Sequence, residues 1–120
     1  MSISVRVIDS TNGCPVADLA VALHTRDHGA WPVVARSRTD SAGNAGSWNG
    51  QALPLGSYRL VLETGDYFAD RAVDSMYAEV IVSLHYQGDP SDLHIQVLLS
   101  PFSYTTYRGH VPWTVPAEKV

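Results

Sequence analysis

Cysteine, charged residues and long apolar runs are all scarce in this chain of 120 residues. Cys14 is the single cysteine, so no intrachain disulfide can form, and we expect a reducing, cytoplasmic location. Charged residues make up 17% and the formal net charge is −4, without a basic cluster, which argues against a nucleic-acid partner. No stretch approaches the roughly 18 apolar residues of a membrane span. Residues 1–6 lack the apolar segment of a signal peptide, so we expect none.

What the sequence contains instead is a series of short strand patterns separated by turn residues. Between Ile3 and Ile8, Val5 and Val7 share one face, and the polar Ser4 and Arg6 lie on the other. We expect strands over residues 3–8, 16–24, 31–39, 58–63, 77–86 and 93–99, and from 105 onward. A hairpin-like turn over 87–90 joins the fifth and sixth of these. The pattern predicts an all-β sandwich of seven to eight strands.

One helix is expected, over residues 67–75. Asp66 is a plausible N-cap, and Phe68, Ala72 and Val73 share one face of such a helix. The length of the chain suits one domain. We place this domain at 1–110 and treat residues 111–120 as a C-terminal extension, partly disordered.

The segment from Leu98 to His110 carries the densest chemistry of the chain. It reads LLSPFSYTTYRGH and joins a strand end, a Ser-Pro break, several hydroxyl and aromatic residues, and a Tyr-Arg-Gly-His cluster. This order closely resembles the C-terminal signature of the 5-hydroxyisourate hydrolases, the transthyretin-like proteins, which normally end in Tyr-Arg-Gly-Ser. Weaker similarities occur in the same order at 7–15, 39–43 and 56–68. The resemblance covers roughly the first 110 residues and implies the transthyretin-like sandwich.

The resemblance also implies where catalytic residues lie. Family members open the ring of 5-hydroxyisourate with a histidine on the first strand, an arginine after the glycine of the second turn, a histidine on the penultimate strand and the terminal motif. The positions in this chain are Arg6, Asn44, His94 and residues 107–110. Two of these positions therefore carry a different residue type, and His110 replaces the terminal serine, with ten residues after it.

The altered set keeps two histidines and two arginines. We predict that His94 and His110 form an acid–base pair and that Arg6 and Arg108 hold an anionic oxygen of the substrate. The predicted substrate-binding residues are Asn44, Gln96, Leu98, Thr105, Tyr107 and Gly109. Tyr107 is a candidate proton relay or channel gate.

Strand alternation supports grouping some of these residues. Arg6 lies opposite Val5 and Val7, and His94 and Gln96 lie opposite the apolar residues at 93, 95 and 97. In the family fold the first and penultimate strands share a sheet whose polar face lines a channel between subunits. The resemblance thus implies a homotetramer with sites at the subunit interface.

Simpler interpretations remain open for several residues. Arg6 can pair with Asp9 or Glu79 on a sheet surface, and His110 can mark an inactive site. His24 and His28 have the spacing of a metal pair but lack further ligands, so we expect no metal. Without a phosphate loop or nucleotide fingerprint we expect no cofactor.

Three functions follow from these residues. The preferred one is an enzyme that acts by His/Arg acid–base chemistry on a small carbonyl-bearing heterocycle, in a specialised biosynthetic pathway. The first alternative is a genuine 5-hydroxyisourate hydrolase of urate catabolism. The second is a non-catalytic carrier like transthyretin, whose channel we expect to be more apolar than one containing Arg6, His94 and His110.

Overall fold

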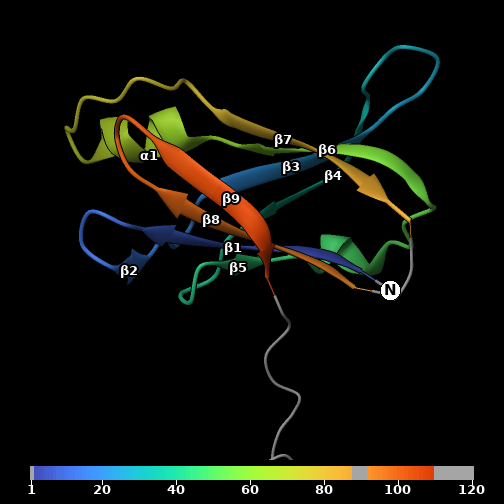
Figure 1. The fold of residues 1–120 in the computed structure, drawn as a ribbon, viewed down its shortest axis with the longest axis horizontal. Coiled ribbons are helices and arrows are strands. Elements are labelled where there is room, and N and C mark those ends of the chain that lie inside the picture. The colour runs from blue at the N-terminus through green and yellow to red at the C-terminus, as the bar shows by residue number, and fades with distance from the viewer. Residues whose placement is uncertain (1, 88–91, 110–120) are drawn as a thin grey trace, which may run out of the picture.

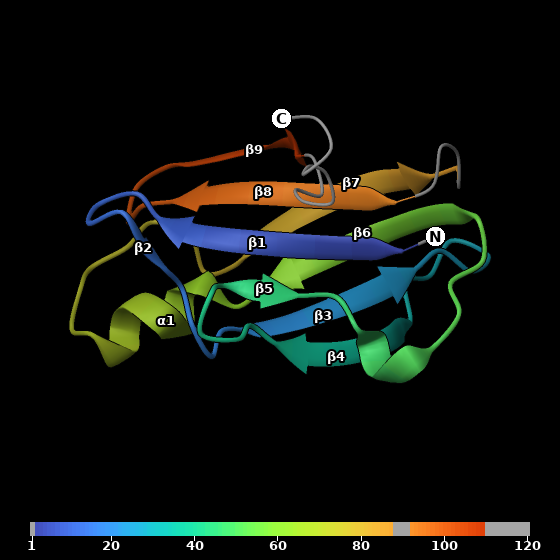
Figure 2. The same cartoon turned by 90° about the horizontal axis from the view of Figure 1, so that it is seen from below.

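Two β-sheets face each other in the computed structural model, which describes residues 2–87 and 92–109 (Figure 1, Figure 2). The elements, in chain order, are β1 (Ile3–Asp9), β2 (Cys14–Pro15), β3 (Ala20–Thr25), β4 (Val33–Arg38), β5 (Asn44–Ala45), the 3₁₀ turn η1 (Trp48–Gly50), β6 (Gly56–Leu62), α1 (Thr64–Asp70), β7 (Val80–Tyr86), β8 (Leu93–Leu99) and β9 (Tyr104–Gly109). Seven of these strands have six or seven residues, and β2 and β5 have two each. The predicted all-β sandwich with one short helix is confirmed.

The first sheet has the order β2-β1-β8-β9, with β5 paired to β1, and the second has the order β4-β3-β6-β7. Strands β1 and β8 run parallel, and β9 is antiparallel to β8. The prediction that the first and penultimate strands share a sheet is therefore correct. This pairing determines which polar side chains of β1 and β8 meet on the outer face of the sheet.

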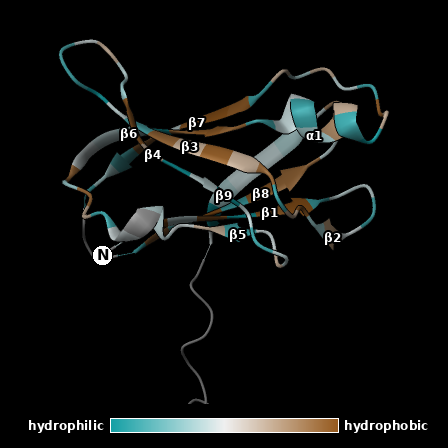
Figure 3. Cartoon of the chain, turned by 180° about the vertical axis from the view of Figure 1, so that it is seen from behind, coloured by the Kyte–Doolittle hydropathy of each residue, from teal (hydrophilic) through white to brown (hydrophobic). Residues whose placement is uncertain are grey.

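The core lies between the sheets and follows from strand alternation. In β1, Ile3, Val5 and Val7 are fully buried, whereas the residues between them are partly exposed. The hydrophobic residues concentrate along the strands in Figure 3. Trp48 closes one end of the core, with its ring buried and its Nε1 donating to the carbonyl of Ile3 at 2.7 Å. The inward residues therefore fix which face of β1 is left for polar side chains.

Three expectations about strands need correction. The strand expected over 16–24 begins only at Ala20, as β3, because residues 16–19 leave the ladder after the short β2 and cross to the other sheet. The strand expected over 77–86 begins at Val80. The expected hairpin over 87–90 is wrong as a pairing, since β7 and β8 belong to different sheets, and residues 88–91 lie outside the described residues.

The helix expected at 67–75 instead spans Thr64–Asp70. Its N-cap is Glu63, so Asp66 lies in the first turn and is not the cap. Phe68 is buried as expected, but Ala72 and Val73 follow the helix and are exposed. The helix ends early because the Phe68 carbonyl accepts from Val73 N at 2.9 Å, which closes a C-terminal cap.

Two further observations concern the whole chain. Among the described residues, no helix has the length and apolar character needed to cross a membrane. The extension predicted at 111–120 lies outside the described residues.

Candidate active site

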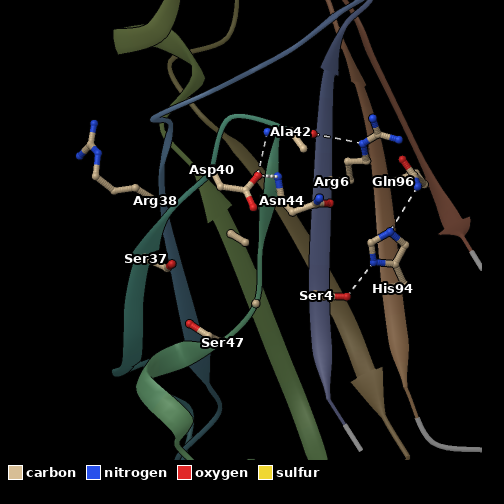
Figure 4. A pocket seen from close by; sticks show the side chains of 12 residues that line it. Ser4, Arg6, Ser37, Arg38, Asp40, Ala42, Asn44, Ser47, His94 and Gln96 are labelled. Carbon is tan, nitrogen blue, oxygen red and sulfur yellow. Dashed lines mark hydrogen bonds between the residues drawn. The ribbon is translucent and has the colours of Figure 1, made fainter. Parts of the chain in front are cut away.

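A pocket with a volume of about 660 Å³ opens beside the polar face of β1 and β8. Its walls come from β1, β8, the end of β4, and the turn that leads into β5 and η1 (Figure 4). The lining residues are Ser4, Arg6, Ser37, Arg38, Asp40, Ala42, Asn44, Ala45, Gly46, Ser47, His94 and Gln96. Four of the residues predicted for the site, from three separate segments, are therefore brought together: Arg6, Asn44, His94 and Gln96.

The parallel register of β1 and β8 explains how two of these segments meet. Ser4 pairs with His94, and Arg6 pairs with Gln96. Because alternate residues of a strand share a face, all four side chains leave the sheet on the same side. The inward neighbours Val5 and Ile95 are buried in the core. The predicted common face of Arg6, His94 and Gln96 is confirmed.

The turn before β5 supplies the third segment. Asp40 Oδ1 accepts hydrogen bonds from the backbone N–H groups of Ala42 and Asn44, each at 2.9 Å. The carbonyl of Gly43 accepts from Val7 N at 2.9 Å, which holds the turn against β1. Gly43 has φ +83°, and a Cβ there would lie 2.4 Å from the carbonyl oxygen of Val7, so only glycine allows this approach. Asn44 and the carbonyl of Ala42 are thereby placed beside Arg6.

His94 is the most enclosed ionisable group of the pocket, with 8% of its surface exposed. Its Nδ1 lies 2.7 Å from Ser4 Oγ, and its Nε2 lies 3.2 Å from Gln96 Nε2. Burial lowers the pKa of His94 below its usual value, and the positive charge of Arg6 lowers it further. The ring is therefore neutral near pH 7 and can accept a proton.

The charges of the pocket are distributed unequally. Arg38 Nε is bound to Asp18 Oδ1 at 2.6 Å, and its Nη2 donates to the Asp18 carbonyl at 2.8 Å. Arg6 Nε donates to the carbonyl of Ala42 at 3.2 Å and has no carboxylate partner among the described residues. The alternative pairing of Arg6 with Asp9 does not occur, since Asp9 is buried and accepts from Tyr67 Oη at 2.9 Å. The guanidinium of Arg6 is thus the cation best placed for an anionic ligand.

Other predicted residues lie on the same face beyond the pocket. Across the β8–β9 ladder, His94 pairs with Gly109, Gln96 with Tyr107, and Leu98 with Thr105. Tyr107 is 51% exposed and Leu98 is 36% exposed. Thr105 and Tyr107 extend this face toward the edge of the sheet. Neither they nor Leu98 and Gly109 line the pocket.

Arg108 lies on the other face of the sheet. Arg108 pairs with Ile95, a core residue, and therefore leaves β9 on the opposite face from His94. Its Nη2 donates to the carbonyl of Asp92 at 3.2 Å. The structure does not bring Arg108 together with Arg6 within one chain. His110 lies outside the described residues.

Ser4 is not among the site residues predicted from sequence, and 39–43 is predicted as a turn without a role at the site for Asp40 or Gly43. Ser4 contacts His94 directly, Asp40 organises the turn, and Gly43 sets its distance from β1. Ser4 was detectable in principle, because it shares the polar face of its strand with Arg6. Its contact with His94, however, depends on the parallel register, which a single sequence does not reveal.

The histidines at 24 and 28 lie away from this site and have protein partners. His24 Nδ1 lies 2.8 Å from the carbonyl of Trp31, and His28 Nδ1 lies 2.7 Å from Asp27 Oδ1. Over residues 2–87 and 92–109, no three histidine, cysteine or acidic side chains gather in a way that could hold a metal ion.

Relatives of known name resemble this chain over most of its length. A "5-hydroxyisourate hydrolase" of Salmonella dublin is 31% identical over 108 residues, which cover 89% of this chain and 79% of the relative. The protein of the same name from Caulobacter vibrioides is 31% identical over 111 residues, covering 89% and 96%.

Solved structures and a family model agree with these relatives. The 5-hydroxyisourate hydrolase of Klebsiella pneumoniae superposes with a TM-score of 0.81 and 25% identity, covering 91% of this chain and 98% of that one. Sea bream transthyretin in complex with thyroxine gives a TM-score of 0.84 at 23% identity, covering 94% and 98%, and shows the shared fold. The model of the HIUase/transthyretin family matches residues 3–109. The chain belongs to the HIUase/transthyretin family.

Proposed function

We propose that this protein is an enzyme that acts by His/Arg acid–base chemistry on a small carbonyl-bearing heterocycle. The observation that carries the proposal is the convergence of Arg6, Asn44, His94 and Gln96 on one pocket. An enclosed neutral imidazole lies beside a guanidinium that has no carboxylate partner in the part of the chain that the structure describes. Together they combine a proton acceptor with a fixed positive charge. The hydrolase names of the relatives support an enzyme of hydrolase type.

The chemistry assigns a distinct part of the reaction to each group. The guanidinium of Arg6 binds an enolate-like or ring oxygen that carries negative charge, and this interaction strengthens as charge develops on that oxygen. The neutral His94 takes a proton from water as the water oxygen attacks the ring carbonyl. The C–N bond then breaks, and the leaving nitrogen receives the proton from His94. Asn44 offers an amide that can donate to a carbonyl or accept from a ring N–H.

The test is turnover of a panel of cyclic amides and imides, including freshly made 5-hydroxyisourate, followed by ultraviolet absorbance. We expect one or more panel members to react faster than their spontaneous rate. His94→Ala should reduce that turnover by about 10²–10⁴-fold, the range typical of a lost general base. Turnover that is unaffected by His94→Ala would contradict the proposed role of this residue.

Genuine 5-hydroxyisourate hydrolysis is the second candidate, and the identity of the named relatives favours it. The resemblance places a family histidine at Arg6 and a family arginine at Asn44. If these differences redirect the enzyme, the double variant Arg6→His with Asn44→Arg should hydrolyse 5-hydroxyisourate faster than the unaltered chain. A wild-type rate that already exceeds that of the double variant would support the second candidate.

The assembly is part of the same proposal. We place the complete site at the interface of a homotetramer, where a second copy would add side chains to the exposed face of β8 and β9. The open side of the pocket and the exposed Tyr107 and Leu98 on that face support this arrangement. In such an assembly, residues that one chain leaves apart can act together across subunits.

A further inference from the structure

Both ring nitrogens of His94 have a partner from the same chain. Ser4 Oγ lies 2.7 Å from Nδ1, and Gln96 Nε2 lies 3.2 Å from Nε2 (Figure 4). A hydroxyl can donate or accept, but an amide nitrogen only donates. Nε2 of the ring must therefore accept, so in the neutral ring Nδ1 carries the proton and donates to Ser4.

The side chains of Ser4 and Gln96 each pack closely against a glycine. A Cβ on Gly109 would lie 2.6 Å from Cγ and 3.2 Å from Nε2 of Gln96. A Cβ on Gly46 would lie 2.7 Å from the Cβ of Ser4. A larger residue at Gly46 or Gly109 would push the neighbouring side chain away. The close backbone also restricts the positions that the Ser4 and Gln96 side chains can adopt.

We propose that Ser4 and Gln96 are positioning residues that hold His94 in one tautomer, with the proton on Nδ1 and the lone pair on Nε2. The inference deepens the proposed function, in which His94 moves the proton. Because the Gln96 amide contacts Nε2, it must move away before the attacking water can donate an O–H to that nitrogen. The tautomer thus determines that Nε2 is the atom that takes the proton.

Nuclear magnetic resonance can read the tautomer directly in the intact, ¹⁵N-labelled protein. Long-range ¹H–¹⁵N correlations of the His94 ring at pH 8 show which nitrogen is protonated, and we expect Nδ1. In Gln96→Glu a carboxylate that only accepts replaces the donor, so the proton should move to Nε2. Ser4→Ala removes the acceptor of Nδ1–H but keeps the Gln96 donor, so the proton should stay on Nδ1 and the chemical shift of Nδ1 should change.

Ser37→Ala is the matched control for Ser4→Ala, because Ser37 lines the same pocket from β4 and has no hydrogen bond to His94 among the described residues. This variant should leave both the tautomer and the chemical shift of Nδ1 unchanged. Gly109→Ala should displace Gln96 and shift the ring toward a mixture of the two tautomers. Circular dichroism on each variant shows whether the sandwich is retained, and a variant that has lost it is replaced by Gln96→Leu, for which a mixture is again expected.

A wild-type ring with its proton on Nε2, or a Gln96→Glu ring that keeps its proton on Nδ1, would overturn the inference. The outcome is separable from that of the proposed function. A ring in the expected tautomer without turnover of any heterocycle would refute the enzyme and retain the positioning. Turnover that requires His94 in a protein with the other tautomer would refute the positioning and retain the enzyme.

Discussion

At the scale of single residues, the proposed chemistry of the pocket depends on the protonation of His94. Its pKa is lowered chiefly by burial and secondly by the charge of Arg6. These causes have different origins, since burial comes from the packing of β8 and the charge from a neighbouring strand. They can therefore be separated by substitution.

The first prediction separates them. Arg6→Gln removes the charge and leaves burial, so the pKa of His94 should rise part of the way toward its usual value. Arg38→Gln is the matched control, since Arg38 lines the same pocket but is bound to Asp18. It should leave the pKa of His94 close to that of the wild type. The measurement is an NMR titration of the His94 ring, and equal shifts in both variants would contradict the assignment to Arg6.

The second prediction concerns stability. Because the folded pKa of His94 is lowered, folding disfavours its protonation. The stabilisation linked to the neutral ring is present above the unfolded pKa, about 6.5, and is lost as the pH falls through the folded pKa. The free energy of unfolding should fall more steeply below about pH 6.5 in the wild type than in His94→Asn. Urea unfolding at a series of pH values checks this, and parallel profiles would argue against it.

The site could be predicted from sequence to the extent that it follows from strand alternation. Arg6, His94 and Gln96 were expected on one face, and the register confirms this. The same rule places Arg108 on the other face, because it pairs with Ile95. Its parity relative to His94 depends on the β8–β9 register, which depends on the turn between them and cannot be read from the spacing alone.

At the scale of elements, the turn from Asp40 to Asn44 leads from β4 into β5, lies against β1 through the Val7–Gly43 hydrogen bond, and forms one wall of the pocket. Gly43 combines a positive φ with close contact to Val7, whereas Gly13 has φ +75° with nothing within 4 Å of the position that a Cβ would take. Substitutions at Gly13 and Gly43 can therefore separate the cost of the backbone conformation from the cost of the contact with Val7.

The third prediction uses this pair. Gly13→Ala should lower the free energy of unfolding by about 0.5–1 kcal/mol, the cost of a left-handed conformation less the smaller unfolded-state entropy of alanine. Gly43→Ala should cost more, about 3 kcal/mol or above, because the methyl group also meets the Val7 carbonyl. Denaturant unfolding measures both. Equal losses would show that the contact between the turn and β1 relaxes freely.

The helix shows why one boundary could not be predicted. Val73 N donates to the Phe68 carbonyl at 2.9 Å, and Ala72 N donates to the Ala69 carbonyl at 3.0 Å, which is the Schellman arrangement that ends a helix. The left-handed position of this motif is Ala72, with φ 57°. Glycine usually marks that position, so the sequence offered no stop signal, and the apolar pattern suggested that the helix continued to residue 75.

The fourth prediction follows from this cap. Ala72→Gly relieves the strain of the left-handed conformation, and the larger unfolded-state entropy of glycine offsets part of this gain. The free energy of unfolding should rise by about 0.5–1 kcal/mol. Ala69→Gly makes the same chemical change inside the helix and should lower it by a similar amount, about 0.5–1 kcal/mol. Thermal or denaturant unfolding of the two variants gives the signs, and a destabilised Ala72→Gly variant would contradict the account of the cap.

At the scale of the whole molecule, the sandwich was predictable and its division into sheets was not. Short strands at regular intervals indicated the architecture, but the assignment of β7 and β8 to different sheets depends on long-range pairing. The family resemblance supplied the pairing of β1 with β8, which strand spacing alone does not contain. Sequence neighbours were therefore a poor guide to spatial neighbours where the chain passes from β7 to β8.

The outer face of β1, β8 and β9 is also where we propose that copies of the chain meet. Leu98 lies on this face with 36% of its surface exposed, opposite Thr105. Val33 on β4 has a similar exposure, 37%, but belongs to the other sheet. The two residues therefore provide comparable apolar side chains on different surfaces of the protein.

The fifth prediction tests the assembly with these residues. Sedimentation velocity of the wild type should show a tetramer, and Leu98→Lys should shift it toward smaller species, because a charge would be buried where copies meet. Val33→Lys should leave the tetramer intact, which controls for the added charge. A monomeric wild type would remove the shared site. A tetramer that is insensitive to Leu98→Lys would place the subunit contacts on another surface, and the side chains of β8 and β9 would then face solvent and not a second copy.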